Sequence, residues 1–146
     1  MITEISYDII EQIWKDYLWK TRSSKIESIS AMLYWKGYDV NNYNYIPKFF
    51  GYKLDDKIVG VNSGHKCFDH TYRSRGLFVF PEYRNHGVGK ELLLATIEQG
   101  RKEKASLVWS YPRQESWSVY ESAGFSLASG WNTGETGVNA FCKIYL

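Results

Sequence analysis

Apolar residues recur every three or four positions in three stretches of the chain, as on one face of an α-helix. The stretches cover residues 9–18, 26–33 and 88–97, and Ser24 with Glu27 resembles a capping box that would start the second one. A fourth helix is predicted over 115–124, because Gly124 suits a C-terminal cap. The pattern therefore predicts four helices, of which the second ends near residue 37 and the third opens at about residue 87.

The other apolar residues predict strands. A short strand is expected at 2–6, and the runs 49–54 and 57–68 predict a hairpin with Val59, Val61, His65 and Cys67 on one face. The remaining predicted strands are 72–80, 106–110, 125–130 and 138–146. Residues 38–47 are rich in Asn and Tyr, which indicates either a loop near a binding face or an ordinary surface connection.

The order of these elements predicts a mixed α/β fold. A helix between the strands at 72–80 and 106–110 would make that strand pair parallel, whereas the hairpins are antiparallel. The chain has 146 residues, so we expect one domain, 1–146. Its 44% hydrophobic content is enough for a core, and its net charge of +2 gives no reason to expect a nucleic-acid binder.

Cysteine usage and hydropathy exclude some classes of site and location. The two cysteines, Cys67 and Cys142, are far apart and match no zinc spacing, so we expect no metal site. The first residues lack a signal-peptide pattern, and no apolar run approaches the ~18 residues of a membrane span. We therefore expect a cytoplasmic protein with free thiols, no membrane association, and either a monomer or a homodimer.

Residues 77–94 carry the clearest candidate chemistry. An apolar strand ends at Pro81, a basic turn with two glycines follows, and a helix begins. Glycines let a ligand approach the backbone, and the free N–H groups of a helix's first turn attract anions. Arg84 and Lys90 add full charges, so the stretch predicts a phosphate or pyrophosphate site.

Two common phosphate-binding motifs do not fit this stretch. A P-loop needs glycine where Arg84 stands and a hydroxyl residue after the lysine, where the chain has Glu91. A dinucleotide fingerprint needs a small residue at Leu92. Both are therefore excluded.

The run VFPEYRNHGVGKELL, followed by VYESAGF, resembles the GCN5-related N-acetyltransferase (GNAT) superfamily. Arg84, Gly87 and Gly89 occupy the fixed positions of that family's R/Q-x-x-G-x-G/A turn, which binds the pyrophosphate of acetyl-CoA. The resemblance implies a central sheet of about seven strands with splayed parallel strands, four helices, and acetyl-CoA as acetyl donor. The cofactor-binding residues it implies are Val79, Arg84, Asn85, His86, Gly87, Val88, Gly89 and Lys90.

The resemblance also implies how the reaction runs. A neutral amine attacks the thioester directly, while a backbone N–H near Val79 stabilises the thioester oxygen. Tyr120 stands where the family often places the general acid for the leaving thiolate, although it could instead simply pack against the preceding helix.

The general base is the weakest match. At the two strand positions where family members often carry an acid or a histidine, the chain has Arg73 and Arg75, and guanidinium is not a base. Water or another residue would then take the proton, with His65, His70, Asp69 and Glu135 as candidates. Arg75 leads to the hypothesis that the acceptor carries a carboxylate. Arg113 replaces a common Asn and would meet a coenzyme phosphate or be solvated.

Three function classes stay open from the sequence. The first is an acetyl-CoA-dependent N-acetyltransferase whose acceptor is a small amine or a protein amine, bound by the two early helices and the segments 38–47 and 132–137. The second is a non-catalytic acyl-CoA-binding module of the same fold. The third is an interaction domain that uses the aromatic residues between 14 and 52.

Overall fold

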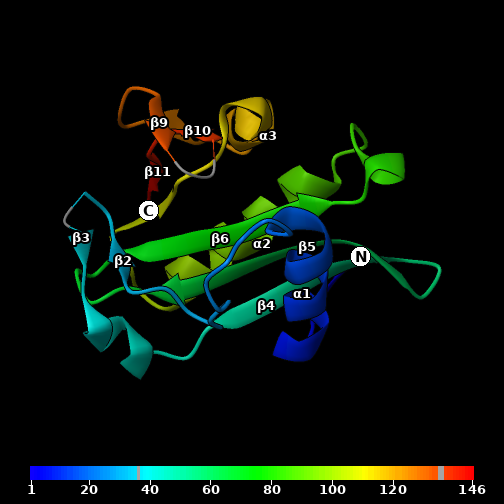
Figure 1. The fold of residues 1–146 in the computed structure, drawn as a ribbon, viewed down its shortest axis with the longest axis horizontal. Coiled ribbons are helices and arrows are strands. Elements are labelled where there is room, and N and C mark those ends of the chain that lie inside the picture. The colour runs from blue at the N-terminus through cyan, green and yellow to red at the C-terminus, as the bar shows by residue number, and fades with distance from the viewer. Residues whose placement is uncertain (36, 135–136) are drawn as a thin grey trace.

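One sheet organises the computed structural model, which describes residues 1–35, 37–134 and 137–146 (Figure 1). The sheet has seven strands in the order β1-β4-β5-β6-β7-β11-β8, and β6 and β7 form its one parallel pair among these residues. This mixed topology confirms the predicted fold class. The strands are β1 (Ile2–Glu4), β4 (Lys48–Leu54), β5 (Lys57–Lys66), β6 (Tyr72–Val79), β7 (Leu107–Ser110), β8 (Ser126–Leu127) and β11 (Cys142–Tyr145).

Helices cover both faces of the sheet, with α1 in front and α2 behind in Figure 1. The α-helices of the described residues are α1 (Tyr7–Ile13), α2 (Val88–Lys102) and α3 (Trp117–Ser122), one fewer than the four predicted. A π-helix, Trp14–Leu18, continues α1. Within the described ranges, no helix has both the length and the apolar content needed to cross a membrane.

Short elements connect these parts. In the part of the chain that the structure describes, two small hairpins lie outside the main sheet and three 3-10 helices mark turns. The hairpins are β2 (Met32–Leu33) with β3 (Gly37–Tyr38) and β9 (Asn132–Gly134) with β10 (Gly137–Asn139); the 3-10 helices are Val40–Asn44, Pro81–Tyr83 and Gln114–Ser116.

The predicted second helix is wrong. Residues 24–31 form bends and irregular chain, and β2 follows. Side chains from elsewhere satisfy this backbone: the Asn42 amide donates to the carbonyls of Ser30 and Met32 at 3.0 and 3.2 Å, and the Ser30 N–H donates to His65. The apolar spacing that mimics a helix instead anchors an extended segment, with Ile29 buried.

The predicted hairpin is confirmed, but its faces differ from the prediction. Asp55 and Asp56 form the turn with φ of 49° and 63°. A register shift beside Tyr52 marks a β-bulge that turns Val59 toward α2, whereas Val61 packs on α1. The last predicted strand, 138–146, is also divided, because β10 belongs to a separate hairpin and only β11 joins the sheet.

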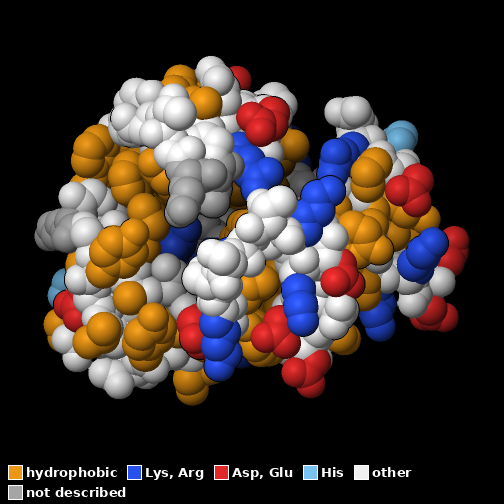
Figure 2. Space-filling view, viewed as in Figure 1, with side chains coloured by type: hydrophobic (Ala, Val, Ile, Leu, Met, Phe, Trp, Pro, Cys, Tyr) orange, Lys and Arg blue, Asp and Glu red, His pale blue; other side chains and the backbone are white. Residues whose placement is uncertain are grey.

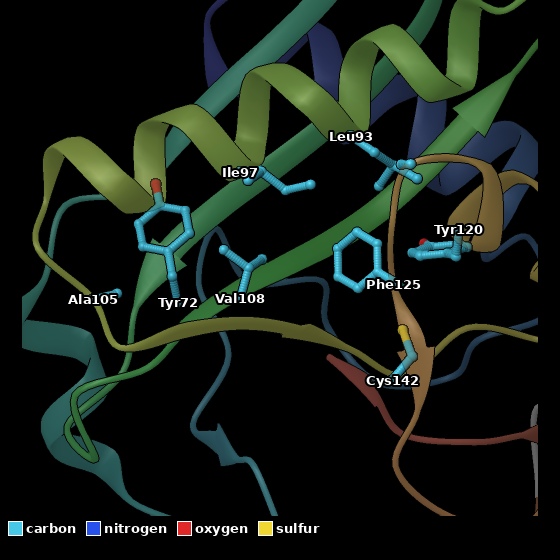
Figure 3. Packing of buried hydrophobic residues seen from close by; sticks show 9 residues of the cluster. Tyr72, Leu93, Ile97, Ala105, Val108, Tyr120, Phe125 and Cys142 are labelled. Carbon is cyan, nitrogen blue, oxygen red and sulfur yellow. The ribbon is translucent and has the colours of Figure 1, made fainter. Parts of the chain in front are cut away.

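The core between α2 and the sheet holds the strands that surround the site. Figure 3 shows Leu93 and Ile97 of α2 facing Val108 of β7, with Phe125 and Tyr120 beside them. Tyr120 therefore reaches from α3 into the same core that fixes β7. This packing sets the positions of β6, β7 and α3 relative to one another.

Candidate active site

The parallel strands β6 and β7 pair at one end only. Their paired residues are Tyr72 with Val108 and Arg73 with Trp109, after which Ser110 Oγ donates to the Ser74 carbonyl at 2.8 Å. Beyond Ser74 the strands have no ladder. The edge of β6 beyond Ser74 that faces β7 therefore has no paired strand among the described residues, and we call the space beside this edge the gap.

A β-bulge in β6 accompanies the gap. The register with β5 passes from Ser63 opposite Arg75 to Val61 opposite Phe78, so two residues of β6, Gly76 and Leu77, stand against one residue of β5. Gly76 has φ of 79°, and its carbonyl accepts from the Trp14 indole N–H at 2.8 Å. Because a bulge bends its strand, it changes the course of β6 just beyond the last pair with β7.

The backbone at Val79 faces this gap. The Phe80 N–H donates to the Val59 carbonyl at 3.0 Å, and neighbouring residues of a strand point to opposite edges, so the Val79 amide points away from β5. The Val79 carbonyl accepts from Arg84 Nε at 2.8 Å, and the guanidinium carbon of Arg84 lies 5.5 Å from the Phe78 ring centroid.

The turn after β6 presents a helix N-terminus to solvent. Positive φ values at Asn85 (64°) and Gly87 (83°) reverse the chain, and the first helical bond of α2 runs from Glu91 N–H to the Gly87 carbonyl at 3.0 Å. The N–H groups of residues 88–90 therefore have no helical partner. The side chains of Arg84, Asn85, His86 and Lys90 are exposed, whereas Val88 and Gly89 are buried.

The two glycines of the motif have different surroundings. A Cβ atom on Gly87 would meet nothing within 4 Å, so its positive φ is the reason for glycine there. A Cβ atom on Gly89 would lie 3.1 Å from Val119 of α3. Gly89 therefore lets α2 and α3 approach closely at the start of α2.

Tyr120 lies within α3, on the side that faces the core, with 4% of its surface exposed. Its ring meets that of Phe125 edge-on, with the centroids 5.5 Å apart (Figure 3). Burial raises the pKa of Tyr120 above its ordinary value, and contact with the Ser110 side chain opposes part of this rise. Its hydroxyl therefore stays protonated near the end of β7, where the gap begins.

Of the four predicted base candidates, three lie in described residues. His65 is fully buried, and its pKa is lowered to about 3 by that burial; Nδ1 lies 2.9 Å from the Lys66 carbonyl and Nε2 accepts from Ser30 N–H. Both ring nitrogens are thus used. Asp69 accepts hydrogen bonds from Thr71, and His70 sits in an exposed turn with φ of 68°. Glu135 falls outside the described residues.

Two arginines lie on the α1 side of β6. Arg75 is 5% exposed, with its guanidinium carbon 5.0 Å from the Trp14 centroid and 5.1 Å from that of Trp19, and Nη1 donates to the Glu27 carbonyl. Burial and the nearby Arg73 lower the pKa of Arg75 to about 9. Arg73 is half-buried, 4.9 Å from the Trp109 centroid, and burial lowers its pKa to about 10. No sequence signal predicted the tryptophan pair around Arg75.

Arg113 is half-buried and contacts the backbone of an early element of the chain. Its Nη2 donates to the Leu18 carbonyl at 3.2 Å, which ties the segment before α3 to the end of the π-helix. This contact lies outside the 84–90 turn, and a role of Arg113 toward a coenzyme phosphate stays a prediction.

A cleft of about 490 Å³ borders the far end of β6, which sequence reasoning did not predict. Aromatic rings form much of its wall, with the Tyr17 and Phe78 centroids 5.7 Å apart. Its lining residues are Tyr17, Lys20, Phe78, Phe80, Pro81, Glu82 and Arg84. Figure 2 shows Lys and Arg side chains beside the notch in the upper edge of the molecule.

Comparison with solved structures finds the same fold. The ribosomal-protein-alanine N-acetyltransferase of Brucella melitensis matches over 100% of this chain and 99% of its own, with a TM-score of 0.66 and 16% identity. An acetyltransferase of Bacillus subtilis in complex with CoA matches over 68% and 77%, with a TM-score of 0.59 and 17% identity. Nourseothricin acetyltransferase matches over 68% and 65%, with a TM-score of 0.60 and 21% identity.

Sequence comparison identifies the family. No curated protein matches the chain by sequence. The profile described as the acetyltransferase (GNAT) family matches residues 7–125, which include β6, the 84–90 turn and α3. The chain therefore belongs to the GNAT acetyltransferase family.

Proposed function

We propose that this protein is an acetyl-CoA-dependent N-acetyltransferase that transfers the acetyl group to a primary amine. The observation that carries the proposal is the gap between β6 and β7, which has the outward-facing amide of Val79 on one wall and a helix N-terminus at its mouth. A CoA molecule needs both features: a strand edge for its amide-rich arm and a cradle for its pyrophosphate.

In this proposal the turn and the strand share the work of binding. The N–H groups of residues 88–90 and the side chains of Arg84 and Lys90 hold the pyrophosphate, with Asn85 and His86 on the rim. The pantetheine arm pairs with the open edge of β6. Arg84 would have to exchange or share its bond to the Val79 carbonyl when phosphate binds.

The reaction is a direct transfer. The neutral amine nitrogen attacks the thioester carbon, and the Val79 N–H donates to the oxygen as it gains charge. The carbon–sulfur bond then breaks, coenzyme A leaves as a thiolate, and the nitrogen loses its proton to water. Among the predicted base candidates, both ring nitrogens of the buried His65 already have partners and Asp69 accepts hydrogen bonds from Thr71, so water is the acceptor that we favour.

Tyr120 would act on the thiolate. Because burial raises its pKa, complete proton transfer to a thiolate is uphill, and a hydrogen bond from the hydroxyl is the cheaper way to stabilise the leaving group. Removal of this donor should slow the chemical step and leave acetyl-CoA binding intact.

The test measures release of free thiol from acetyl-CoA with a panel of amines, together with thermal stabilisation by acetyl-CoA alone. Tyr120→Phe should lower kcat by about 100-fold or more while stabilisation persists. Tyr72→Phe is the matched control, because Tyr72 belongs to the same core and its hydroxyl has no hydrogen-bond partner among the described residues. It should keep the wild-type rate.

Three other results would count against the proposal. Stabilisation by acetyl-CoA without thiol release for any amine would favour a non-catalytic acyl-CoA-binding module. The absence of stabilisation would favour an interaction domain instead. Equal rates for Tyr120→Phe and the wild type would remove Tyr120 from the mechanism while leaving transferase activity in place.

A further inference from the structure

Three arginines converge on the α1 side of β6 without a carboxylate partner in the described residues. Arg22 and Arg75 both contact the Trp19 ring, with guanidinium carbons 5.3 and 5.1 Å from its centroid, and Arg73 lies on Trp109. The ion pairs found within 4.0 Å in these residues involve other cations, namely Lys48 with Glu4 and Arg101 with Glu98. Like charges in a partly dry region repel one another, so an anion would be stabilised there.

The guanidinium of Arg75 already has partners within the protein. Its guanidinium lies against two tryptophan rings and donates to the Glu27 carbonyl at 2.9 Å, and only 5% of the residue is exposed. A substrate would have to displace these contacts to reach it. Arg75 is therefore better suited to hold the segment around Glu27 against β6 than to bind a ligand.

Arg73 is the arginine of this cluster whose hydrogen-bond donors are still unused within the described residues. It retains partial exposure, yet its Nε is shielded from water and has no hydrogen-bond partner among the described residues. Its two Nη atoms also make no hydrogen bond within the described residues and, unlike Nε, are not shielded from water, so the oxygens of a ligand can reach them. The flat face on Trp109 also fixes the direction of the guanidinium fork.

Arg73 stands where the gap closes. It forms the last parallel pair with β7 and precedes Ser74, whose carbonyl accepts from the Ser110 side chain that Tyr120 approaches. A ligand group on Arg73 therefore lies on the α1 side of the same point that Tyr120 approaches from α3.

We propose that the acceptor amine carries a carboxylate and that Arg73 binds this carboxylate through its guanidinium fork. The inference rests on the proposed function, because it names the class of acceptor for that reaction. It replaces the sequence-based choice of Arg75 for the same task. The arginine cluster would also disfavour a second positive charge, so the acceptor would bind as the neutral amine that attack requires.

The experiment compares each standard amino acid with its α-amide as acceptor, by thiol release from acetyl-CoA. We expect the best substrate to be an acid, with kcat/KM about 10- to 100-fold above that of its amide. Arg73→Gln should abolish this ratio, and Arg73→Lys should retain part of it. Arg101→Gln, which removes the same charge from the exposed face of α2, should leave the ratio unchanged.

The outcomes separate this inference from the proposed function. Turnover that favours amides, or a preference for acids that survives in Arg73→Gln, would overturn the inference while the transferase activity stands. If no amine is acetylated, the proposed function fails, and the inference is then decided by binding. Acids but not amides must raise the melting temperature of the wild type, and must not do so in Arg73→Gln; failure of either condition also overturns it.

Discussion

Substitution of Gly76 by alanine should be among the most destabilising small changes in this protein. An added Cβ atom would lie far inside van der Waals contact with Cε2 and Nε1 of Trp14, and Trp14 is fully buried. The φ of 79° is also unfavourable for any residue with a Cβ atom.

The size of the effect follows from three contributions. The left-handed conformation costs alanine about 1–2 kcal/mol, and overpacking a rigid indole costs about 1–3 kcal/mol. Displacement of Trp14 also weakens its 2.8 Å hydrogen bond to the Gly76 carbonyl, worth about 1 kcal/mol. The sum is about 3–6 kcal/mol, which for a chain of this length lowers Tm by about 10 °C or more.

The assay is urea denaturation followed by tryptophan fluorescence, with thermal unfolding alongside it. Gly87→Ala is the matched control, because Gly87 has φ of 83° but open space around its Cβ position, so it reports the conformational cost alone. We expect Gly76→Ala to lose at least about 2 kcal/mol more than the control. Equal losses would refute the claim that contact with Trp14 requires glycine at the bulge.

Three further predictions concern other parts of the molecule. Asn42→Ala should lower the free energy of unfolding by about 2–4 kcal/mol in urea, because it removes hydrogen bonds to Ser30, Met32 and Phe68; a loss below about 1 kcal/mol would contradict this. The folded-state pKa of His65, about 3, lies below its unfolded value of about 6.5, so its stabilising effect is complete above pH 6.5 and declines as pH falls. Unfolding free energy measured from pH 7 to 5 should therefore fall less steeply in His65→Gln than in the wild type, and identical slopes would contradict the assignment. Gly89→Val should raise KM for acetyl-CoA, because a side chain 3.1 Å from Val119 must push the start of α2 off α3; unchanged KM would show that this approach is not needed.

The parts of the fold that were predictable are those where local pattern and tertiary role agree. The hairpin at Asp55 and Asp56, the helix after Gly87 and the parallel pairing of β6 with β7 all follow from periodicity, turn chemistry and the right-handed crossover rule. The turn motif with Arg84, Gly87 and Gly89 could be recognised in the sequence because backbone conformation and close packing require glycine at its two glycine positions. Its roles in binding and catalysis remain predictions.

The features that the sequence does not predict depend on contacts between residues that are distant in sequence. The segment around Ser30 has helical spacing, but hydrogen bonds from Asn42 and His65 hold it in an extended path that no local rule contains. A glycine inside a strand often marks a β-bulge, so the sequence around Gly76 contains the signal for this one. Nothing in the sequence indicates that Arg75 lies between two tryptophans while Arg73 keeps a free donor.

The π-helix Trp14–Leu18 makes this protein sensitive to the number of residues in its first helix. Its defining bond, from Trp19 N–H to the Trp14 carbonyl at 2.7 Å, spans one residue more than an α-helical bond. Deletion of one residue inside this turn would convert this bond to α-helical spacing and change the direction of the side chains within the turn. Tyr17, which lies inside the turn, would then lose its contact with Phe78. Substitutions at exposed positions of this turn should therefore be tolerated far better in evolution than insertions or deletions.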